Sequence, residues 1–151
     1  MKRLLTFDEI KELEGQEVAL TQWFEIDQDR INKFAESTLD KQWIHIDEEK
    51  AKKGPFKKTI AHGYLLISLL PHLSGDSFIT PKGSRMAINY GMDKLRFIHP
   101  VTVGSKIRDR IVLTSVTKKA DGSVLLVYSH RLEIKEKEKP ALIVDTLVVF
   151  N

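Results

Sequence analysis

Residues 34–68 read FAESTLDKQWIHIDEEKAKKGPFKKTIAHGYLLIS, and they hold the most apolar helical pattern of the chain next to its most reactive polar side chains. The helical pattern begins at His62 and extends to Leu73. Apolar residues occupy nearly every position of this segment, which leaves almost no polar face. A helix that is apolar all round is buried all round, so we expect the rest of the chain to enclose it.

A β pattern dominates the sequence after Ser84, and it supplies the enclosing layer. The expected strands cover residues 86–98, 105–117, 123–134 and 141–150. Asp121-Gly122 is a strong hairpin signal, so the last three strands form an antiparallel meander. Gly91 marks a bulge in the strand expected over residues 86–98. These features predict an α+β fold in which residues 1–151 form a single hot-dog domain, with a long antiparallel sheet wrapped around the buried central helix.

Capping residues mark three shorter helices ahead of the buried one. Each begins after a side chain whose oxygen accepts hydrogen bonds from first-turn amides. The caps are Thr6, Asp27 and Asp47, and the helices are expected to end near residues 15, 38 and 53. Residues 16–25 alternate as a strand, and residues 40–46 are expected to form a loop.

Composition excludes several classes of function. The 151 residues contain no cysteine, which removes disulfides, thiol catalysis and thiolate metal sites. The net charge of +3 is too small to indicate nucleic-acid binding. No apolar run approaches the ~20 residues of a membrane span, and no signal-peptide core is present. We expect a cytoplasmic protein with neither a nucleic-acid nor a membrane partner.

Asp40 and His45 are the first candidate pair. Asp40 follows the C-terminus of the helix expected over residues 27–38, where the helix dipole disfavours a carboxylate by ~0.3–1 kcal/mol. His45 lies in an apolar segment. If the two converge, they can hold one water and move its protons at neutral pH. A solvated loop aspartate and a core histidine are the structural alternatives.

Gly63 opens the buried helix, and first-turn amides have no acceptor within a helix. Without a side chain in the way, a ligand carbonyl can approach the Gly63 amide as in an oxyanion hole. Alternatively, Gly63 only permits close packing against a strand. Ser68 either bonds back to the Tyr64 carbonyl or orients a catalytic group. Three other histidines, His72, His99 and His130, have no partner motif in the sequence.

Together, these segments resemble the MaoC-like dehydratase family of hot-dog proteins, and within it the nodulation protein N-like branch. The resemblance extends from about Gly15 to the end of the chain. It rests on Asp40-Lys41-Gln42-Trp43-Ile44-His45, Gly54-Pro55-Phe56, Thr59-Ile60-Ala61-His62-Gly63-Tyr64, residues 89–97 and residues 100–105.

The family includes (R)-specific enoyl-CoA hydratases, so the resemblance implies 3-hydroxyacyl-thioester dehydratase activity. It assigns catalytic roles to Asp40, His45 and the Gly63 amide. We assign substrate binding to Gln42, Trp43, His62, Tyr64 and Ser68. No metal or cofactor is expected, and coenzyme A or an acyl-carrier arm serves as the substrate handle. A hot-dog thioesterase and a non-catalytic acyl-thioester binding module are the alternatives.

Two further expectations concern the edge of the sheet and the residue before Asp40. A single sheet around one helix leaves a free edge, which is a liability unless it is covered, so we expect a homodimer or a dimer of dimers. The hydratases usually have glycine where this chain has Leu39, and Asn-Pro where it has Gln42-Trp43. The second change is normal for the nodulation-like branch, whereas Leu39 is strained if its φ is positive.

Overall fold

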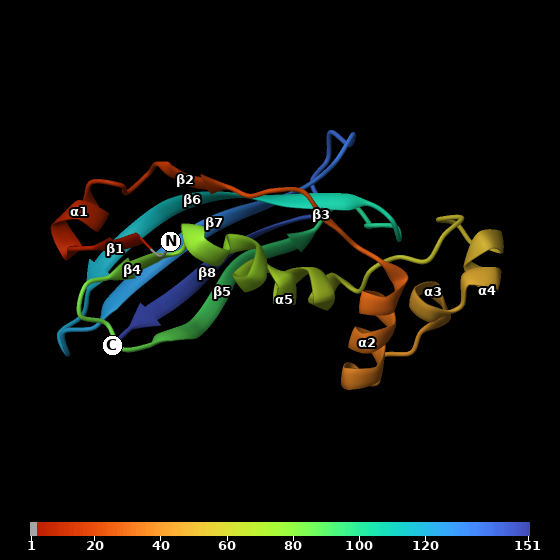
Figure 1. Cartoon of the computed structure of the whole chain (residues 1–151), viewed down its shortest axis with the longest axis horizontal. Coiled ribbons are helices and arrows are strands. Elements are labelled where there is room, and N and C mark those ends of the chain that lie inside the picture. Colours follow the sequence, from red (N-terminus) through yellow and green to blue (C-terminus); the bar gives the residue numbers. More distant parts are fainter. Residues whose placement is uncertain (1–2) are drawn as a thin grey trace.

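The computed structural model describes residues 3–151, and its main feature is a long antiparallel sheet (Figure 1). The strand order is β2-β6-β7-β8-β5, with β3 also paired to β6. These strands are β2 Glu17–Leu20, β3 Phe24–Glu25, β5 Ala87–Phe97, β6 Lys106–Lys118, β7 Val124–Ile134 and β8 Leu142–Phe150. Strands β1 (Arg3–Leu5) and β4 (Ile79–Pro81) form a separate parallel pair.

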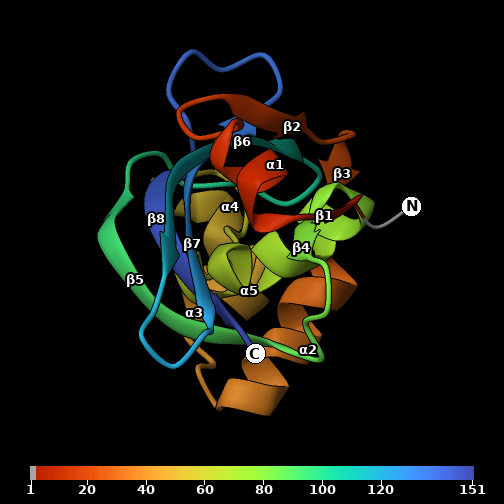
Figure 2. The ribbon, with the colours of Figure 1, turned by 90° about the vertical axis from the view of Figure 1, so that its left-hand side faces the viewer.

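The sheet curls around helix α5 (Gly63–Ser74), as the view along the molecule shows (Figure 2). The other helices are α1 Phe7–Lys11, α2 Gln28–Thr38, α3 Trp43–Ile46, α4 Glu48–Lys53 and the 3₁₀ turn η1 Gly75–Ser77. Helices α2, α3 and α4 gather at one end of the molecule (Figure 1). The expected α+β hot-dog arrangement, including the β6-β7-β8 meander, is confirmed.

The caps expected from the sequence begin the helices. Thr6 and Glu9 form a capping box, and the Asp47 carboxylate accepts a hydrogen bond from the first turn of α4. The Asp27 carboxylate accepts from the Arg30 amide at 2.7 Å. Ile26 and Ile31, on either side of this cap, are fully buried in one apolar cluster. This hydrophobic staple fixes the direction in which α2 leaves the sheet.

Two local expectations were wrong. Residues 43–46 form the single turn α3 rather than a loop, because the His45 and Asp47 amides bond to carbonyls three or four residues back. The strand expected over residues 16–25 is interrupted between β2 and β3. There the Thr21 hydroxyl, rather than a backbone carbonyl, accepts the hydrogen bond from the Asp109 amide at 2.8 Å.

Helix α5 is not buried on all sides, which also corrects the sequence-based expectation. Leu65, Leu66 and Leu69 are buried, whereas Tyr64 is 71% exposed. Ser68, Pro71 and His72 are exposed with Tyr64 and form one stripe along the helix. The reason is geometric: one curved sheet covers one side of a helix, and the other side of α5 has no layer over it.

Strand β5 is the outer strand of the sheet, and nearly all of its residues are exposed. The register against β8 shifts between Asn89 and Gly91, which confirms the expected bulge. Large apolar side chains in and beside β5 face solvent, namely Met86, Ile88, Tyr90, Met92, Phe97 and Ile98. Within residues 3–151, no helix combines the length and the apolar character needed to cross a bilayer.

Candidate active site

Leu39 ends α2 in the left-handed conformation, with φ 63° and ψ 10°. The positive φ considered for this position is therefore confirmed. The turn sends the chain sharply away from the helix axis and leaves Asp40 half-buried beside α5. The Leu39 side chain is 76% exposed, so little burial offsets the cost of the left-handed backbone.

His45 is held in one tautomer by a backbone carbonyl. Its side chain is 6% exposed, and Nδ1 lies 2.7 Å from the carbonyl oxygen of Ile60. A carbonyl oxygen only accepts, so Nδ1 carries the hydrogen and Nε2 keeps its lone pair. Burial lowers the pKa of His45, with nearby His62 acting in the same direction, against the opposing effects of the Ile60 bond and Asp40. The imidazole is therefore neutral at pH 7 and can accept a proton at Nε2.

His62 fixes the position of Asp40 and packs on His45. It is buried at the N-cap of α5, and its Nε2–H donates to the Asp40 carbonyl oxygen at 2.9 Å. The His62 ring stacks on the His45 ring with centroids 3.7 Å apart and an interplanar angle of 22°. Nδ1 of His62 is buried with no hydrogen-bond partner among residues 3–151.

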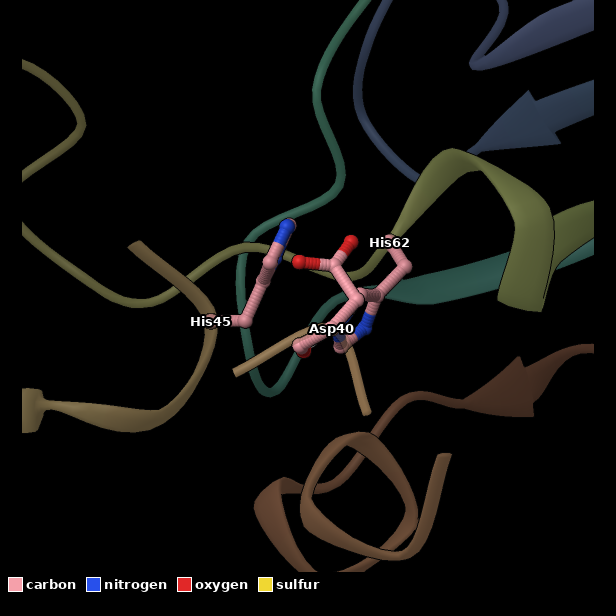
Figure 3. A group of neighbouring side chains, drawn as sticks. All are labelled: Asp40, His45 and His62. Atoms are coloured by element: carbon pink, nitrogen blue, oxygen red, sulfur yellow. Dashed lines mark hydrogen bonds between the residues drawn. The ribbon is translucent and has the colours of Figure 1, made fainter. Parts of the chain in front are cut away.

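The side chains of Asp40, His45 and His62 meet in one cluster (Figure 3). One potential ligand atom from each lies within 4.8 Å of the other two. A tetrahedral metal bound by both histidines needs their lone pairs to converge on one point, whereas two stacked, nearly parallel rings direct them side by side. The cluster therefore suits proton transfer better than metal binding, and the absence of a metal stays a prediction.

Gly63 is the first residue of α5, so its amide hydrogen has no acceptor within the helix. The Phe97 ring of β5 packs against this glycine, and a Cβ at position 63 would lie 2.7 Å from a Phe97 ring carbon. Close packing, the alternative considered for Gly63, is therefore present. It does not exclude the oxyanion role, because packing involves the Cβ position and the oxyanion role involves the amide.

A hollow of about 360 Å³ lies beside His45 and the beginning of α5. Most of its lining is apolar, and it includes Gly63, Tyr64 and Phe97 together with His45. The site thus offers a neutral imidazole and the first amide of α5 at an apolar space, with the Asp40 carboxylate next to the imidazole. Such a combination can hold a water next to an apolar ligand and stabilise an oxyanion.

The expected substrate-binding residues lie at different distances from this hollow. Gln42 donates weakly to the Asp40 carboxylate at 3.4 Å, and Tyr64 lines the hollow itself. The Ser68 hydroxyl donates to the Tyr64 carbonyl at 2.8 Å, so the back-bonded alternative is observed. The Trp43 ring packs against Gly54 and under the Lys50 ammonium group. The roles of these residues in binding stay predictions.

Sequence reasoning missed residues that support the pair. Gln28 of α2 donates to the His45 carbonyl at 2.8 Å and accepts a hydrogen bond from the buried Thr59 hydroxyl. Ile60 contributes only a carbonyl oxygen, which any residue type would supply. Neither contact has a sequence signal, because both join segments that are distant along the chain.

The interpretation of His130 as isolated was wrong. Its Nδ1 lies 2.7 Å from the Asp109 carboxylate, and its Nε2 lies 2.9 Å from the Thr146 hydroxyl oxygen. The alternation of apolar and polar residues in the sequence was enough to predict that Asp109, His130 and Thr146 lie on strands. Only the register of the strands decides that the three side chains meet.

Comparison with known proteins identifies relatives along most of the chain. The MaoC like domain model matches residues 9–133. The chain is 40% identical over 146 residues to 3-hydroxyacyl-thioester dehydratase Z of Mycobacterium tuberculosis, covering 95% of this chain and 96% of that protein. It is 35% identical over 146 residues to nodulation protein N of Rhizobium meliloti, covering 96% and 91% respectively. Both findings agree with the resemblance drawn from the sequence motifs.

A solved structure agrees with the fold. The R-hydratase of Pseudomonas aeruginosa superposes with a TM-score of 0.76 at 21% identity, covering 97% of this chain and 86% of that chain. At this level of identity the match establishes a shared architecture.

Replacing Leu39 with glycine is expected to raise the free energy of unfolding by up to about 1 kcal/mol. A non-glycine residue loses about 1–2 kcal/mol in the left-handed conformation, whereas glycine adopts it freely at some cost in unfolded-state entropy. Urea unfolding measures the change. Ser37→Gly, in an exposed helical position nearby, is the control and should lower stability by about 0.5–1 kcal/mol. Destabilisation by both substitutions would contradict the strain at Leu39.

Proposed function

Because this chain belongs to the MaoC-like domain family, we propose that it is a hydratase/dehydratase that adds water reversibly to a trans-2-enoyl thioester and forms an (R)-3-hydroxyacyl thioester. The convergence of Asp40 and His45 beside the Gly63 amide carries the proposal. Coenzyme A or an acyl-carrier arm is the proposed handle, and the reaction needs no further cofactor. The relatives' names, dehydratase and R-hydratase, support the reaction class.

The Asp40–His45 pair has the spacing needed to hold one water. Two acceptors that each bind one hydrogen of the same water lie roughly 4.5 Å apart, given hydrogen bonds of about 2.8 Å. A carboxylate oxygen of Asp40 lies within 4.8 Å of a ring nitrogen of His45. One water hydrogen points to the His45 Nε2 lone pair and the other to the Asp40 carboxylate. The water oxygen is then free to attack.

Hydration proceeds in two balanced steps. The water oxygen bonds to Cβ of the enoyl thioester while one water proton passes to the pair, and the C=C electrons move to the thioester oxygen. The Gly63 amide donates a hydrogen bond to the resulting enolate oxygen. The proton then moves from the pair to Cα as the enolate collapses. Both new bonds form on the face where the pair lies, which makes the addition syn.

One assay separates this proposal from the alternatives. With crotonyl-CoA, hydration removes the enoyl absorbance and releases no thiol, whereas a thioesterase releases free coenzyme A. A non-catalytic binding module does neither but gives a binding isotherm in calorimetry. Thiol release without loss of the double bond would overturn the proposed reaction.

Asp40→Asn and His45→Gln are each expected to lower kcat for crotonyl-CoA hydration at least ~10²-fold, the low end for loss of acid–base catalysis. Because the pair acts as a unit, the double variant should be little slower than the slower single variant. Circular dichroism checks that each variant is folded. Asp29→Asn, on the exposed side of α2, is the control and should retain the parent rate. A near-parent rate in either site variant would refute the pair.

The acid limb of the pH profile is expected to lie below 6.5, the ordinary pKa of histidine. His45 must be neutral to accept a proton, and burial lowers its pKa, so the neutral form persists to lower pH than in a free imidazole. As the pH falls, kcat/KM for hydration should therefore decline with a midpoint below 6.5. Tryptophan fluorescence at each pH separates this decline from unfolding. A midpoint above 6.5 would contradict a neutral, buried His45.

We also propose that β5 joins two copies of the chain. This edge strand presents unpaired backbone groups and exposes Ile88, Tyr90 and Met92 to solvent. Uncovered edges of this kind promote association, and large apolar patches on a surface mark interaction sites. Pairing β5 with the β5 of a second copy would give the backbone groups hydrogen-bond partners and would also bury the apolar side chains.

Light scattering at micromolar concentration should give a mass of twice or four times 17.3 kDa. Tyr90→Glu should shift the mass toward the monomer, because it places a charge in the proposed interface. Leu4→Glu is the matched control, since Leu4 is also a large exposed side chain, 57% exposed against 62% for Tyr90, but lies on β1. A monomeric parent protein, or an equal effect of both substitutions, would refute the β5 interface.

A further inference from the structure

A row of polar side chains crosses the inner face of the sheet. Asp109 of β6 is fully buried, His130 of β7 is nearly so, and Thr146 of β8 is half-buried. The Asp109 carboxylate and His130 Nδ1 lie 2.7 Å apart, and His130 Nε2 lies 2.9 Å from Thr146 Oγ1. The row separates the apolar core into two clusters, one containing Ile107 and the other Ile111.

The row is not explained by stability. Buried ionisable pairs are often replaceable by apolar residues at no cost, and the second Asp109 oxygen is buried without a hydrogen-bond partner among residues 3–151. A residue that breaks a local rule of folding is a candidate for function. The proton-transfer site at Asp40 and His45 does not use this row.

The row directs a hydrogen-bond donor toward its Thr146 end. Burying a net charge is costly, so the two least costly states of the pair carry none: a carboxylate with an imidazolium, or a carboxylic acid with a neutral imidazole. In the second state the acid donates to Nδ1, so Nε2 carries the hydrogen in both. His130 Nε2–H then donates to Thr146, and the Thr146 hydroxyl hydrogen is left to donate elsewhere.

Thr146 and His130 lie at a hollow of about 370 Å³ between α5 and the strands β5 and β8. Its lining from α5 includes Ile67, Leu70 and Pro71, and most of the lining surface is apolar. Ser68, Ser74 and Asn89 also line it, but His130 and Thr146 differ from them in being tied to a buried carboxylate. Apolar pockets with a few placed polar groups use those groups to select a ligand.

The hollow lies further along α5 from the proposed reaction site. Ile67 and Leu70 follow Gly63 by four and seven residues, which corresponds to about 6 and 10 Å along a helix axis at about 1.5 Å per residue. To reach this hollow, a thioester whose carbonyl meets the Gly63 amide would extend its acyl chain this far along α5. The Thr146 donor would then meet the distal part of the chain.

From this geometry we infer that the protein selects acyl chains that carry an oxygen in their distal part, a hydroxyl or keto group that accepts a hydrogen bond from Thr146. The inference rests on the proposed hydratase function and specifies its substrate class. Asp109 and His130 are positioning residues: they hold the Thr146 hydroxyl so that its hydrogen points into the hollow. An unsubstituted alkyl chain of the same length leaves this donor unpaired, which costs affinity.

The test compares medium-chain trans-2-enoyl-CoA thioesters with counterparts of equal length that carry a distal hydroxyl or keto group at successive carbons. The measured quantity is the ratio of kcat/KM for the oxygenated and the plain substrate. The parent protein should favour at least one oxygenated substrate by tenfold or more. Thr146→Val keeps the shape and removes the donor, so the ratio should fall to near one. Thr146→Ser restores the hydroxyl and should restore the preference.

Thr114→Val is the matched control, because Thr114 is an exposed threonine of β6 that donates only to the Val127 carbonyl. It should leave the ratio at the parent value. No preference in the parent protein, or a preference that survives Thr146→Val, would overturn the inference. Crotonyl-CoA, whose short chain ends before the hollow, tests the proposed hydratase function separately. If the parent protein hydrates nothing, calorimetry measures the affinities for saturated acyl-CoA with and without the distal oxygen. The ratio of these two affinities then replaces the ratio of kcat/KM, and the same results in the parent protein and in Thr146→Val support or overturn the inference.

Discussion

Two buried histidines donate hydrogen bonds to backbone carbonyls of other segments, and the geometry of the proposed site depends on these two bonds. His45 donates to Ile60, and His62 donates to Asp40, so the segment after α2 and the segment before α5 are tied together in both directions. Most buried polar groups in proteins have hydrogen-bond partners. The two bonds therefore fix which nitrogen of His45 faces the site and where the Asp40 backbone lies, and a catalytic geometry follows from ordinary hydrogen-bond satisfaction.

The second network around a buried histidine, formed by Asp109, His130 and Thr146, has a different result. At His45, the ring bonds to the Ile60 carbonyl and the backbone carbonyl accepts from Gln28, and these hydrogen bonds hold the loop in place. The Asp109–His130–Thr146 row instead interrupts the apolar core, at a kind of position that apolar side chains often fill at no cost in stability. Burial raises the pKa of Asp109, and the bond from His130 opposes this. In the proposed substrate selection, the charge balance of Asp109 and His130 sets the direction of the Thr146 hydroxyl at the end of the row.

The uncovered side of α5 and the free edge of the sheet have the same cause. A single curved sheet covers one face of the helix, so Tyr64 and the β5 side chains face solvent together. Tyr64 packs edge-on against Phe97, and both line the hollow beside His45 and Gly63. A second copy seated on β5 would therefore lie next to the mouth of the proposed site, and assembly and substrate access would be linked.

The sequence by itself determined the helix caps, the β meander, the central helix and the candidate pair Asp40 and His45, because caps, turns and alternation are local signals. The sequence also indicated that Leu39 is strained if its φ is positive, and the φ observed at this C-cap is positive. Only the tertiary structure decided which face of α5 is exposed, that residues 43–46 form a turn of helix, and that His62 and Ile60 hold the pair. It alone showed that His130 is not isolated. Apart from the α3 turn, whose hydrogen bonds are local, these features depend on strand register and on contacts between segments far apart in the chain.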